Sequence, residues 1–281
     1  MDQDKLHQLI HSALEEDIGT GDHSTLCCIP PETTGKAILK IKQAGVLAGV
    51  EVARTIFQTV DPEVVFHPLK NDGDTMQPGE TAFEVTAPVH VILKTERLVL
   101  NTMQRMSGIA TLTKTYTRKL EGYHTRLLDT RKTTPNFRLL EKEAVRIGGG
   151  ENHRFGLYDM IMLKDNHIDY CGGISKAILR AHDYIQNHPD LKIEVETRSL
   201  EDVREVLNTG KVHRIMLDNF EPKAVREAVQ LINGRFETEA SGGIQLHNIE
   251  EYAATGVDFI SSGSVIHQAV SLDLSLKAVI L

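Results

Sequence analysis

Residues 191–241 read LKIEVETRSLEDVREVLNTGKVHRIMLDNFEPKAVREAVQLINGRFETEAS, and this stretch decides the fold. Short apolar runs of strand length alternate in it with longer runs of helical periodicity. The capping pattern of Ser199 and Asp202 predicts the start of one helix, and Gly210 predicts its end. The predicted strands are 191–197, 212–218 and 235–241, and the second helix is 221–232. Repeated strand–helix units imply parallel strands with right-handed crossovers.

The same alternation continues on both sides of this stretch. Further strands are predicted at 125–130, 158–164 and 257–263, with helices at about 173–187 and 246–255. Thr134 and Pro135 predict the start of another helix, as its cap and first-turn proline, and Gly148 predicts its end. The last four strands recur at intervals of about 21–23 residues, the length of a compact βα unit.

Units of this kind close into a barrel or open into a doubly wound sheet. We predict an α/β barrel, because no glycine-rich dinucleotide fingerprint opens the first unit. Glycine-rich loops instead follow the last two strands, in EASGGI (239–244) and SSGS (261–264), where barrels commonly bind phosphate.

The first part of the chain has a different pattern. Four apolar residues at helical spacing predict a helix over 3–16, and strand-length pieces with turn formers fill 35–92. A helical region follows at about 94–120, with a weak point at Ser107 and Gly108. We place an α+β N-terminal domain at 1–110 and the barrel domain at 111–269, with the tail, about 270–281, able to pack back on the first domain.

Composition narrows the functional classes. The net charge of -8 and the pI of about 5.9 argue against a general nucleic-acid binder and make any local cluster of cations informative. No stretch approaches the ~20 apolar residues of a membrane helix, and the acidic N-terminus lacks the pattern of a secretory signal, so we expect a cytoplasmic protein. Cys27, Cys28 and Cys171 fit no zinc spacing and are interpreted as reduced thiols. A nucleophilic Cys171 stays open, without a visible activating group.

The residues that close the predicted strands carry the candidate site, because the carboxyl ends of parallel barrel strands share one face. These residues are Arg131, Lys132, Lys164, Glu196, Asp218, Asn219, Ser241, Gly242, Gly243, Ser262, Gly263 and Ser264, with His153 and Arg154 on the loop before the second strand. The cations are suited to clamping carboxylates, and the glycine-rich loops to binding a phosphate. Glu196 and Asp218 could hold Mg²⁺, which takes one or two carboxylates plus phosphate oxygens.

Each feature also has a purely structural explanation. Arg131 and Lys132 could be a solvated surface pair, and Lys164 could simply extend its charge into water. Glu196 could pair with Lys192 or Arg198, and such surface pairs contribute little. Their convergence on one face favours an anion-binding site for a substrate with carboxylates and a second substrate with phosphates.

One long segment of the chain resembles a known protein family. Residues 129–168, DTRKTTPNFRLLEKEAVRIGGGENHRFGLYDMIMLKDNHI, closely resemble the signature region of the quinolinate phosphoribosyltransferases, also called nicotinate-nucleotide pyrophosphorylases (carboxylating). The resemblance extends to EDIGTGD (16–22), ERLVLNTMQRMSGIAT (96–111), EVET (194–197), LDNF (217–220), SGGI (241–244) and ISSGS (260–264).

The resemblance implies an incomplete α/β barrel beside a β-containing N-terminal domain, assembled at least as a homodimer. It also implies a transferase of NAD biosynthesis. The ribose 5-phosphate of phosphoribosyl pyrophosphate would pass to the ring nitrogen of quinolinate with loss of CO₂, giving nicotinate mononucleotide and pyrophosphate.

The resemblance further implies a role for each matching residue. Arg131, His153 and Arg154 would hold the quinolinate carboxylates. Lys132 and Lys164 would lie near pyrophosphate and substrate, and Glu196 and Asp218 would face the ribose and Mg²⁺. The two lysines and the two carboxylates would be the catalytic groups. The 5′-phosphate would lie against Ser241, Gly242, Gly243, Gly263 and Ser264, and Arg97 would reach the neighbouring subunit's site. Whether Glu194 or Glu196 carries the acidic role stays open, since both lie on one strand face.

Two residues depart from the family pattern. Asn136 stands where the family usually has glycine, and asparagine tolerates the same left-handed backbone. Ser264 replaces a usual alanine and adds a possible phosphate donor.

Two other functions remain as alternatives. Lys164 could be the Schiff-base lysine of an aldolase. A non-catalytic relative could also keep the cationic clamp to bind another anionic ligand.

Overall fold

The computed structural model describes residues 1–279 and divides into two compact units. The first unit comprises Met1–Lys114, Thr133–Gly149 and the described residues from Val265. The second unit comprises Thr115–Lys132 and Gly150–Ser264. Residues 280 and 281 of the predicted tail lie outside the described residues.

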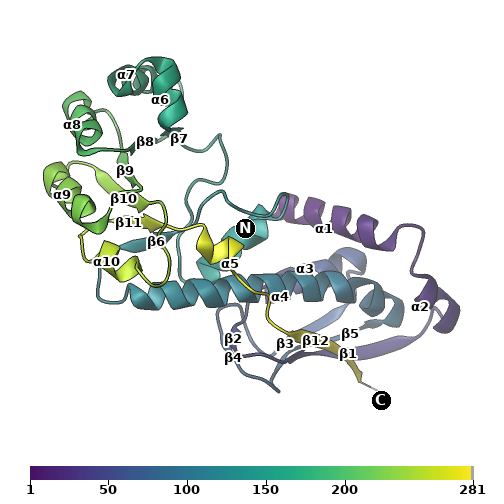
Figure 1. Cartoon of the computed structure of the whole chain (residues 1–281). Coiled ribbons are helices and arrows are strands. Elements are labelled where there is room, and N and C mark those ends of the chain that lie inside the picture. The colour runs from purple at the N-terminus through teal and green to yellow at the C-terminus, as the bar shows by residue number, and fades with distance from the viewer. Residues whose placement is uncertain (280–281) are drawn as a thin grey trace. The chain divides into compact units, whose positions relative to one another are not determined.

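An antiparallel four-stranded sheet in the order β12-β1-β5-β3 organises the first unit (Figure 1). Its strands are β1 (Thr34–Ile41), β3 (Val65–Pro68), β5 (Thr81–Pro88) and β12 (Leu274–Val279), and a separate antiparallel pair consists of β2 (Gly45–Val46) and β4 (Thr75–Met76). The rings of Phe57, Phe66 and Phe83 pack together on this sheet, with centroids 4.5 to 6.2 Å apart. β12, near the C-terminus, thus pairs with β1, which lies early in the sequence.

The first unit contains several helices. They are α1 (Gln3–Ile18), α2 (His23–Cys28), α3 (Val50–Val60) and α5 (Arg138–Ile147), while α4 (Val89–Lys119) continues into the second unit and α11 (Ser264–His267) begins at its last residue. In α1, Leu6, Ile10 and Leu14 are buried, as the helical spacing predicts. No helix within residues 1–279 combines the length and the apolar character needed to cross a bilayer.

The predicted weak point in α4 is wrong, because the helix is continuous through it. The Ser107 hydroxyl accepts a hydrogen bond from the Ala48 N–H at 3.0 Å and donates to the Ala48 carbonyl at 3.2 Å. A side chain at Gly108 would overlap the backbone carbonyl of Val270. These two small residues therefore allow close packing and do not interrupt the helix.

The predicted start of α5 is also wrong, since the helix begins at Arg138 and not at Pro135. Thr134 donates its backbone N–H (2.8 Å) and its hydroxyl (3.0 Å) to the buried carboxylate of Glu141. Asn136 follows with a φ of 62°, the left-handed conformation for which asparagine is suited. A tight turn therefore occupies the positions where the sequence predicts the first turn of a helix.

The second unit contains a parallel six-stranded sheet in the order β6-β11-β10-β9-β8-β7 (Figure 1). The strands are β6 (Arg126–Leu128), β7 (Ile161–Leu163), β8 (Ile193–Thr197), β9 (Arg214–Asp218), β10 (Glu237–Ser241) and β11 (Phe259–Ser261). A parallel bridge between Leu128 and Glu151 extends it beyond β6, and β6 and β7 remain unpaired with each other. The prediction of an α/β fold with an incomplete parallel barrel is confirmed.

Helices connect these strands along one face of the sheet (Figure 1). They are α6 (Asp165–Cys171), α7 (Ile174–Ile185), α8 (Leu200–Thr209), α9 (Pro222–Ile232) and α10 (Ile249–Ala253). The Ser199 side chain accepts from the Asp202 N–H, which confirms the predicted cap of α8. Sequence periodicity misses α6, which is too short to display a helical period. Because the strands are parallel, their carboxyl ends lie at one edge of the sheet.

Candidate active site

A cavity of about 580 Å³ opens at the carboxyl ends of these strands, within the second unit. Its lining residues are Asp129, Thr130, Arg131, Lys132, His153, Arg154, Met162, Lys164, Glu196, Met216, Asp218, Asn219, Glu239, Ser241, Gly242, Gly243 and Ser261. Most are polar or charged, and they come from all six strands or the loops beside them. This composition suits a small, highly charged ligand.

Most of the predicted site residues meet in this cavity. Those that line it are Arg131, Lys132, His153, Arg154, Lys164, Glu196, Asp218, Asn219, Ser241, Gly242 and Gly243. Gly263 and Ser264 follow β11 but do not line the cavity, whereas Ser261 does. Arg97 is exposed on α4, in the first unit, and does not line this cavity either. The proximity of distant segments is thus observed, and the role of each residue stays a prediction.

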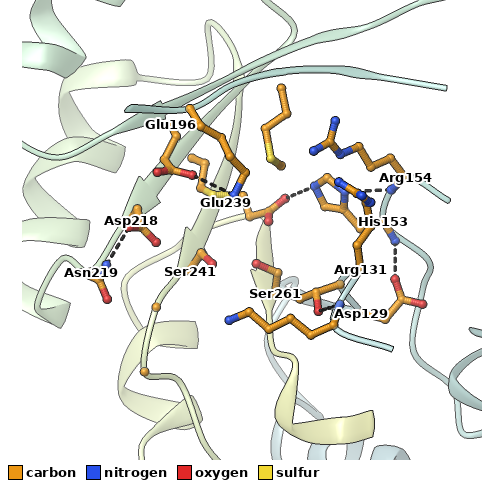
Figure 2. Close-up of a pocket in the computed structure, with 17 residues that line it drawn as sticks. Asp129, Arg131, His153, Arg154, Glu196, Asp218, Asn219, Glu239, Ser241 and Ser261 are labelled. Carbon is orange, nitrogen blue, oxygen red and sulfur yellow. Dashed lines mark hydrogen bonds and ion pairs between the residues drawn. The ribbon is translucent and has the colours of Figure 1, made fainter. Parts of the chain in front are cut away.

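Figure 2 shows Arg131, His153 and Arg154 on one side of the cavity. The buried Asp129 carboxylate accepts the backbone N–H of His153 at 2.9 Å, and the Arg154 guanidinium donates to the Met160 carbonyl at 3.2 Å. Burial, followed by the nearby charge of Arg131, lowers the pKa of Arg154. Two guanidinium groups that repel each other beside a cavity favour the binding of an anion between them.

Glu196 and Asp218 lie on the opposite side, with Asn219 (Figure 2). Burial raises the pKa of Glu196, Lys164 opposes this shift, and the charge of Asp218 adds to it. Burial likewise raises the pKa of Asp218, against a hydrogen bond of 2.6 Å from Asn219. The Lys164 ammonium lies 3.5 Å from the Glu196 carboxylate. A cation at this acidic side would relieve the cost of holding both carboxylates ionised.

The glycine-rich turn after β10 presents bare backbone to the cavity. Gly242 and Gly243 have φ angles of 92° and 64°, which ordinary residues rarely adopt. A side chain at Gly242 would also overlap the Asn219 amide, whereas Gly243 has open space around it. Ser241 precedes them and accepts the Asn219 N–H through its carbonyl at 2.8 Å. Successive turns of this kind form a concave surface that binds anionic oxygens.

His153, in the wall of the cavity, belongs to a buried group of charged residues. Its Nε2 is 2.9 Å from Glu194 Oε2 and 3.4 Å from Glu239 Oε2, and both carboxylates are fully buried. Arg214 donates to Glu239 at 2.9 Å and to Glu237 at 3.0 and 3.1 Å. Glu194 therefore contacts His153 from behind, while Glu196 faces Lys164.

The protonation of His153 is subject to opposing influences. Burial alone lowers its pKa, but the hydrogen bonds and charges of Glu194 and Glu239 outweigh burial and raise the pKa to about 9. The Arg154 N–H faces Nδ1 at 2.7 Å, which favours an unprotonated Nδ1. We favour the imidazolium at neutral pH, because attraction to two buried carboxylates outweighs one neutral hydrogen bond.

Sequence reasoning missed several lining residues. Glu239 lies two residues before Ser241, and Met216 two residues before Asp218. Side chains two positions apart on a strand share a face, so the period of two could have predicted both. The same spacing holds for Met162, two residues before Lys164, and for Asp129, two residues before Arg131.

Comparison with known proteins matches almost the whole chain. The family model for the N-terminal domain of quinolinate phosphoribosyl transferase matches residues 22–107, and that for the C-terminal domain matches residues 109–277. The chain belongs to the quinolinate phosphoribosyl transferase family.

Individual members of the quinolinate phosphoribosyl transferase family agree with this assignment. The chloroplastic nicotinate-nucleotide pyrophosphorylase (carboxylating) of Arabidopsis thaliana is 44% identical, over 97% of this chain and 82% of its own length. The probable nicotinate-nucleotide pyrophosphorylase of Bacillus subtilis is 42% identical, over 97% of this chain and 93% of its own. The crystal structure of NadC from Streptococcus pyogenes is 40% identical, with a TM-score of 0.93 over 100% of this chain and 99% of that one. The resemblance stated from the sequence is confirmed.

Proposed function

We infer that this protein is a pentosyltransferase, a decarboxylating quinolinate phosphoribosyltransferase. It would convert quinolinate and phosphoribosyl pyrophosphate to nicotinate mononucleotide, pyrophosphate and CO₂, a step in NAD biosynthesis. The observation that carries this inference is one cavity with cations on one side and a carboxylate pair on the other, in a chain of this family.

The cationic side suits the dicarboxylate. Arg131 and Arg154 would each donate to a carboxylate of quinolinate, and the positive charge of the His153 imidazolium would attract the same carboxylates. The planar guanidinium fork can bind a carboxylate through two parallel hydrogen bonds. Such a clamp would fix the pyridine nitrogen relative to the ribose, and positioning of this kind accounts for a large share of rate enhancement in bimolecular reactions.

The acidic side suits the ribose. Breaking the bond between C1 and pyrophosphate leaves positive charge on the sugar, which the Glu196 and Asp218 carboxylates would stabilise. Lys132 and Lys164 would take up the negative charge of the departing pyrophosphate. The pyridine nitrogen then forms the new bond to C1, and the electrons of the broken bond leave with pyrophosphate.

Glu196 and Asp218 also fit a magnesium ion, because both carboxylates line the same cavity and burial raises the pKa of each. Mg²⁺ bound there would neutralise charge on the pyrophosphate. The glycine-rich turn at Ser241, Gly242 and Gly243 would receive the 5′-phosphate, together with Gly263 and Ser264 after the neighbouring strand β11.

Decarboxylation would follow bond formation. The ring nitrogen is then positively charged and stabilises the electron pair that the breaking bond to the 2-carboxylate leaves on C2. CO₂ leaves, and C2 takes a proton. The 3-carboxylate stays in the product, so the residues that hold it contribute to binding in both steps.

The proposal includes a homodimer or larger assembly in the cytoplasm, with Arg97 of one subunit entering the site of another. In support, Arg97 is exposed and lies outside the cavity of its own second unit. Family membership makes the aldolase and the non-catalytic binder weaker alternatives.

One assay tests the function: pyrophosphate and CO₂ release with quinolinate, repeated with nicotinate. We expect both products with quinolinate and neither with nicotinate, which lacks the second carboxylate. Binding without turnover would favour the non-catalytic binder, and a borohydride-trapped adduct at Lys164 would favour the aldolase.

A further inference from the structure

Four charged side chains are buried together beneath the cationic side of the cavity: His153, Glu194, Arg214 and Glu239. Burying charges is costly unless each has a partner of opposite sign, and replacing such groups by apolar ones often stabilises a protein. A buried ion network is therefore weak evidence for a role in stability alone, and its position beneath the cavity points to a second role.

The group forms a chain of contacts that ends at the cavity. Glu237 and Glu239 on β10 bind Arg214 on β9, and Glu239 lies 3.4 Å from the ring of His153. His153 lines the cavity, whereas Arg214 does not. Arg214 can therefore influence a ligand in the cavity only through its neighbours.

The ring of Phe259 fixes the Arg214 guanidinium from one side. The guanidinium carbon lies 4.1 Å from the centroid of that ring, within the range of a cation–π interaction. With the ring contact and hydrogen bonds to two carboxylates, Arg214 has little freedom to move. Glu239 is held in the same way by its ion pairs with Arg214 and His153.

The same cluster has the residue types of a metal site, since ligand atoms of His153, Glu194 and Glu239 lie within 4.8 Å of one another. Arg214 and His153 already supply positive charge to the two carboxylates, however. A divalent ion would bring additional positive charge beside both cations. The contacts therefore favour a positioning role over a metal site.

We propose that Arg214, acting through Glu239, is a positioning residue that fixes the ring of His153 for the dicarboxylate substrate; this inference rests on the proposed function. Because the ring is held by Glu194 and Glu239, the charge of the imidazolium stays in place at the cavity wall, where it attracts a carboxylate of the ligand. Residues that orient the groups in contact with a ligand commonly alter affinity by about 10–100-fold when they are changed.

Arg126 provides a matched control. Its guanidinium also stacks on Phe259, 4.5 Å from the centroid, but it pairs with the exposed Glu151 at 3.0 Å. Neither Arg126 nor Glu151 lines the cavity. The variants Arg214→Gln and Arg126→Gln thus each remove a guanidinium that stacks on Phe259. Only Arg214→Gln also removes the ion-pair partner of Glu239.

The test measures the Kd of quinolinate by calorimetry and the kinetic constants of the full-length enzyme. We expect Arg214→Gln to raise the Kd of quinolinate about 10-fold, with the KM of phosphoribosyl pyrophosphate within about 2-fold of the parent value. Arg214→Lys, which keeps a charged donor, should recover part of the loss. Arg126→Gln should match the parent in both constants.

A double-variant cycle separates positioning from general damage. In a His153→Ala background, Arg214→Gln should cause no further loss of quinolinate affinity. If Arg214→Gln does not fold because Glu239 loses its partner, the neutral variant Arg214→Gln/Glu239→Gln replaces it and should show the same loss.

Two results would overturn the inference: a folded Arg214→Gln enzyme with unchanged quinolinate affinity, or an equal loss with and without His153. A parent protein that releases no pyrophosphate with quinolinate would instead refute the proposed function, so the two failures are distinguishable.

Discussion

Two arginine–glutamate ion pairs, each with a fully buried carboxylate, have different roles in this protein. In the first unit, Arg105 donates to Glu141 at 2.9 and 3.0 Å, and its remaining hydrogen bonds go to the backbone carbonyls of Ile266 and Ala269. In the second unit, Arg214 donates to Glu239, whose other neighbour is a ring that lines the cavity. The first pair joins backbone segments of one unit, and the second leads to a group that can meet a ligand. An arginine–glutamate pair can therefore contribute to stability or to ligand binding, depending on which groups its two members contact.

The largest expected effect is on stability, from the first pair. Glu141→Gln should destabilise the protein by about 3–5 kcal/mol, because Arg105 loses its buried counter-charge. Denaturant unfolding measures this change. Arg146→Gln, which breaks the partly exposed pair with Glu143, is the control and should cost about 1 kcal/mol or less. Equal losses in the two variants would contradict the stabilising role of the Arg105 pair.

The contacts of His153 with Glu194 and Glu239, beside the second pair, should make stability depend on pH. The folded pKa of His153 is about 9 against 6.5 in the unfolded chain, so its stabilisation is complete below pH 6.5 and is lost as pH rises through 9. This difference between the folded and unfolded pKa of His153 corresponds to at most about 3–4 kcal/mol. The raised pKa of Glu194, about 7 through burial and then the charge of Glu239, acts in the same direction at lower pH.

Thermal unfolding between pH 6.5 and 9.5 checks this sign. His153→Gln should flatten the fall in stability toward high pH, while the exposed His124→Gln should keep the slope of the parent protein. A His153→Gln slope identical to that of the parent would show that the ring is neutral at pH 7, with Nδ1 accepting the Arg154 N–H.

Removing a residue from the cationic side should affect binding more than folding. Arg154→Ala should weaken quinolinate binding about 100-fold, because charged hydrogen bonds contribute about 1.5–3 kcal/mol each. Calorimetry with quinolinate, alongside a thermal melt, separates the two effects. An unchanged quinolinate affinity in both Arg131→Ala and Arg154→Ala would remove the basis of the proposed substrate.

The smallest expected effect on stability comes from Thr134, which donates a hydrogen bond to Glu141 of the first pair. Thr134→Val removes the hydroxyl that donates to Glu141 at 3.0 Å but keeps the backbone N–H bond, so we expect a loss of about 1–2 kcal/mol in unfolding free energy. Quinolinate affinity should stay the same. A loss as large as that of Glu141→Gln would mean that the hydroxyl, and not Arg105, is the main partner of the carboxylate.

Much of the second unit was predictable, because segments of strand length alternate with segments of helical periodicity along the sequence. Reading the residue that closes each strand predicted Lys164, Glu196 and Asp218 as neighbours, since parallel strands end at one edge. Family resemblance, and not periodicity, gave a role to Arg97.

The remaining features depend on contacts that a single sequence does not reveal. The turn at Thr134 follows from a distant arginine and its carboxylate partner, which override a local helix signal. Arg214 begins a strand far from the carboxyl ends, so reading strand ends could not find it. Long-range ion pairs of this kind have no sequence period.

The pairing of β12 with β1 has a consequence for how the chain folds as it is synthesised. All strands of the second unit lie between residues 126 and 261, so its sheet can form before residues 274–279 leave the ribosome. Until then β1 presents an open edge, and an unpaired edge is a template for aggregation. Truncation before Leu274 should therefore lower the yield of soluble protein, although the residues removed come after all the cavity residues in the sequence.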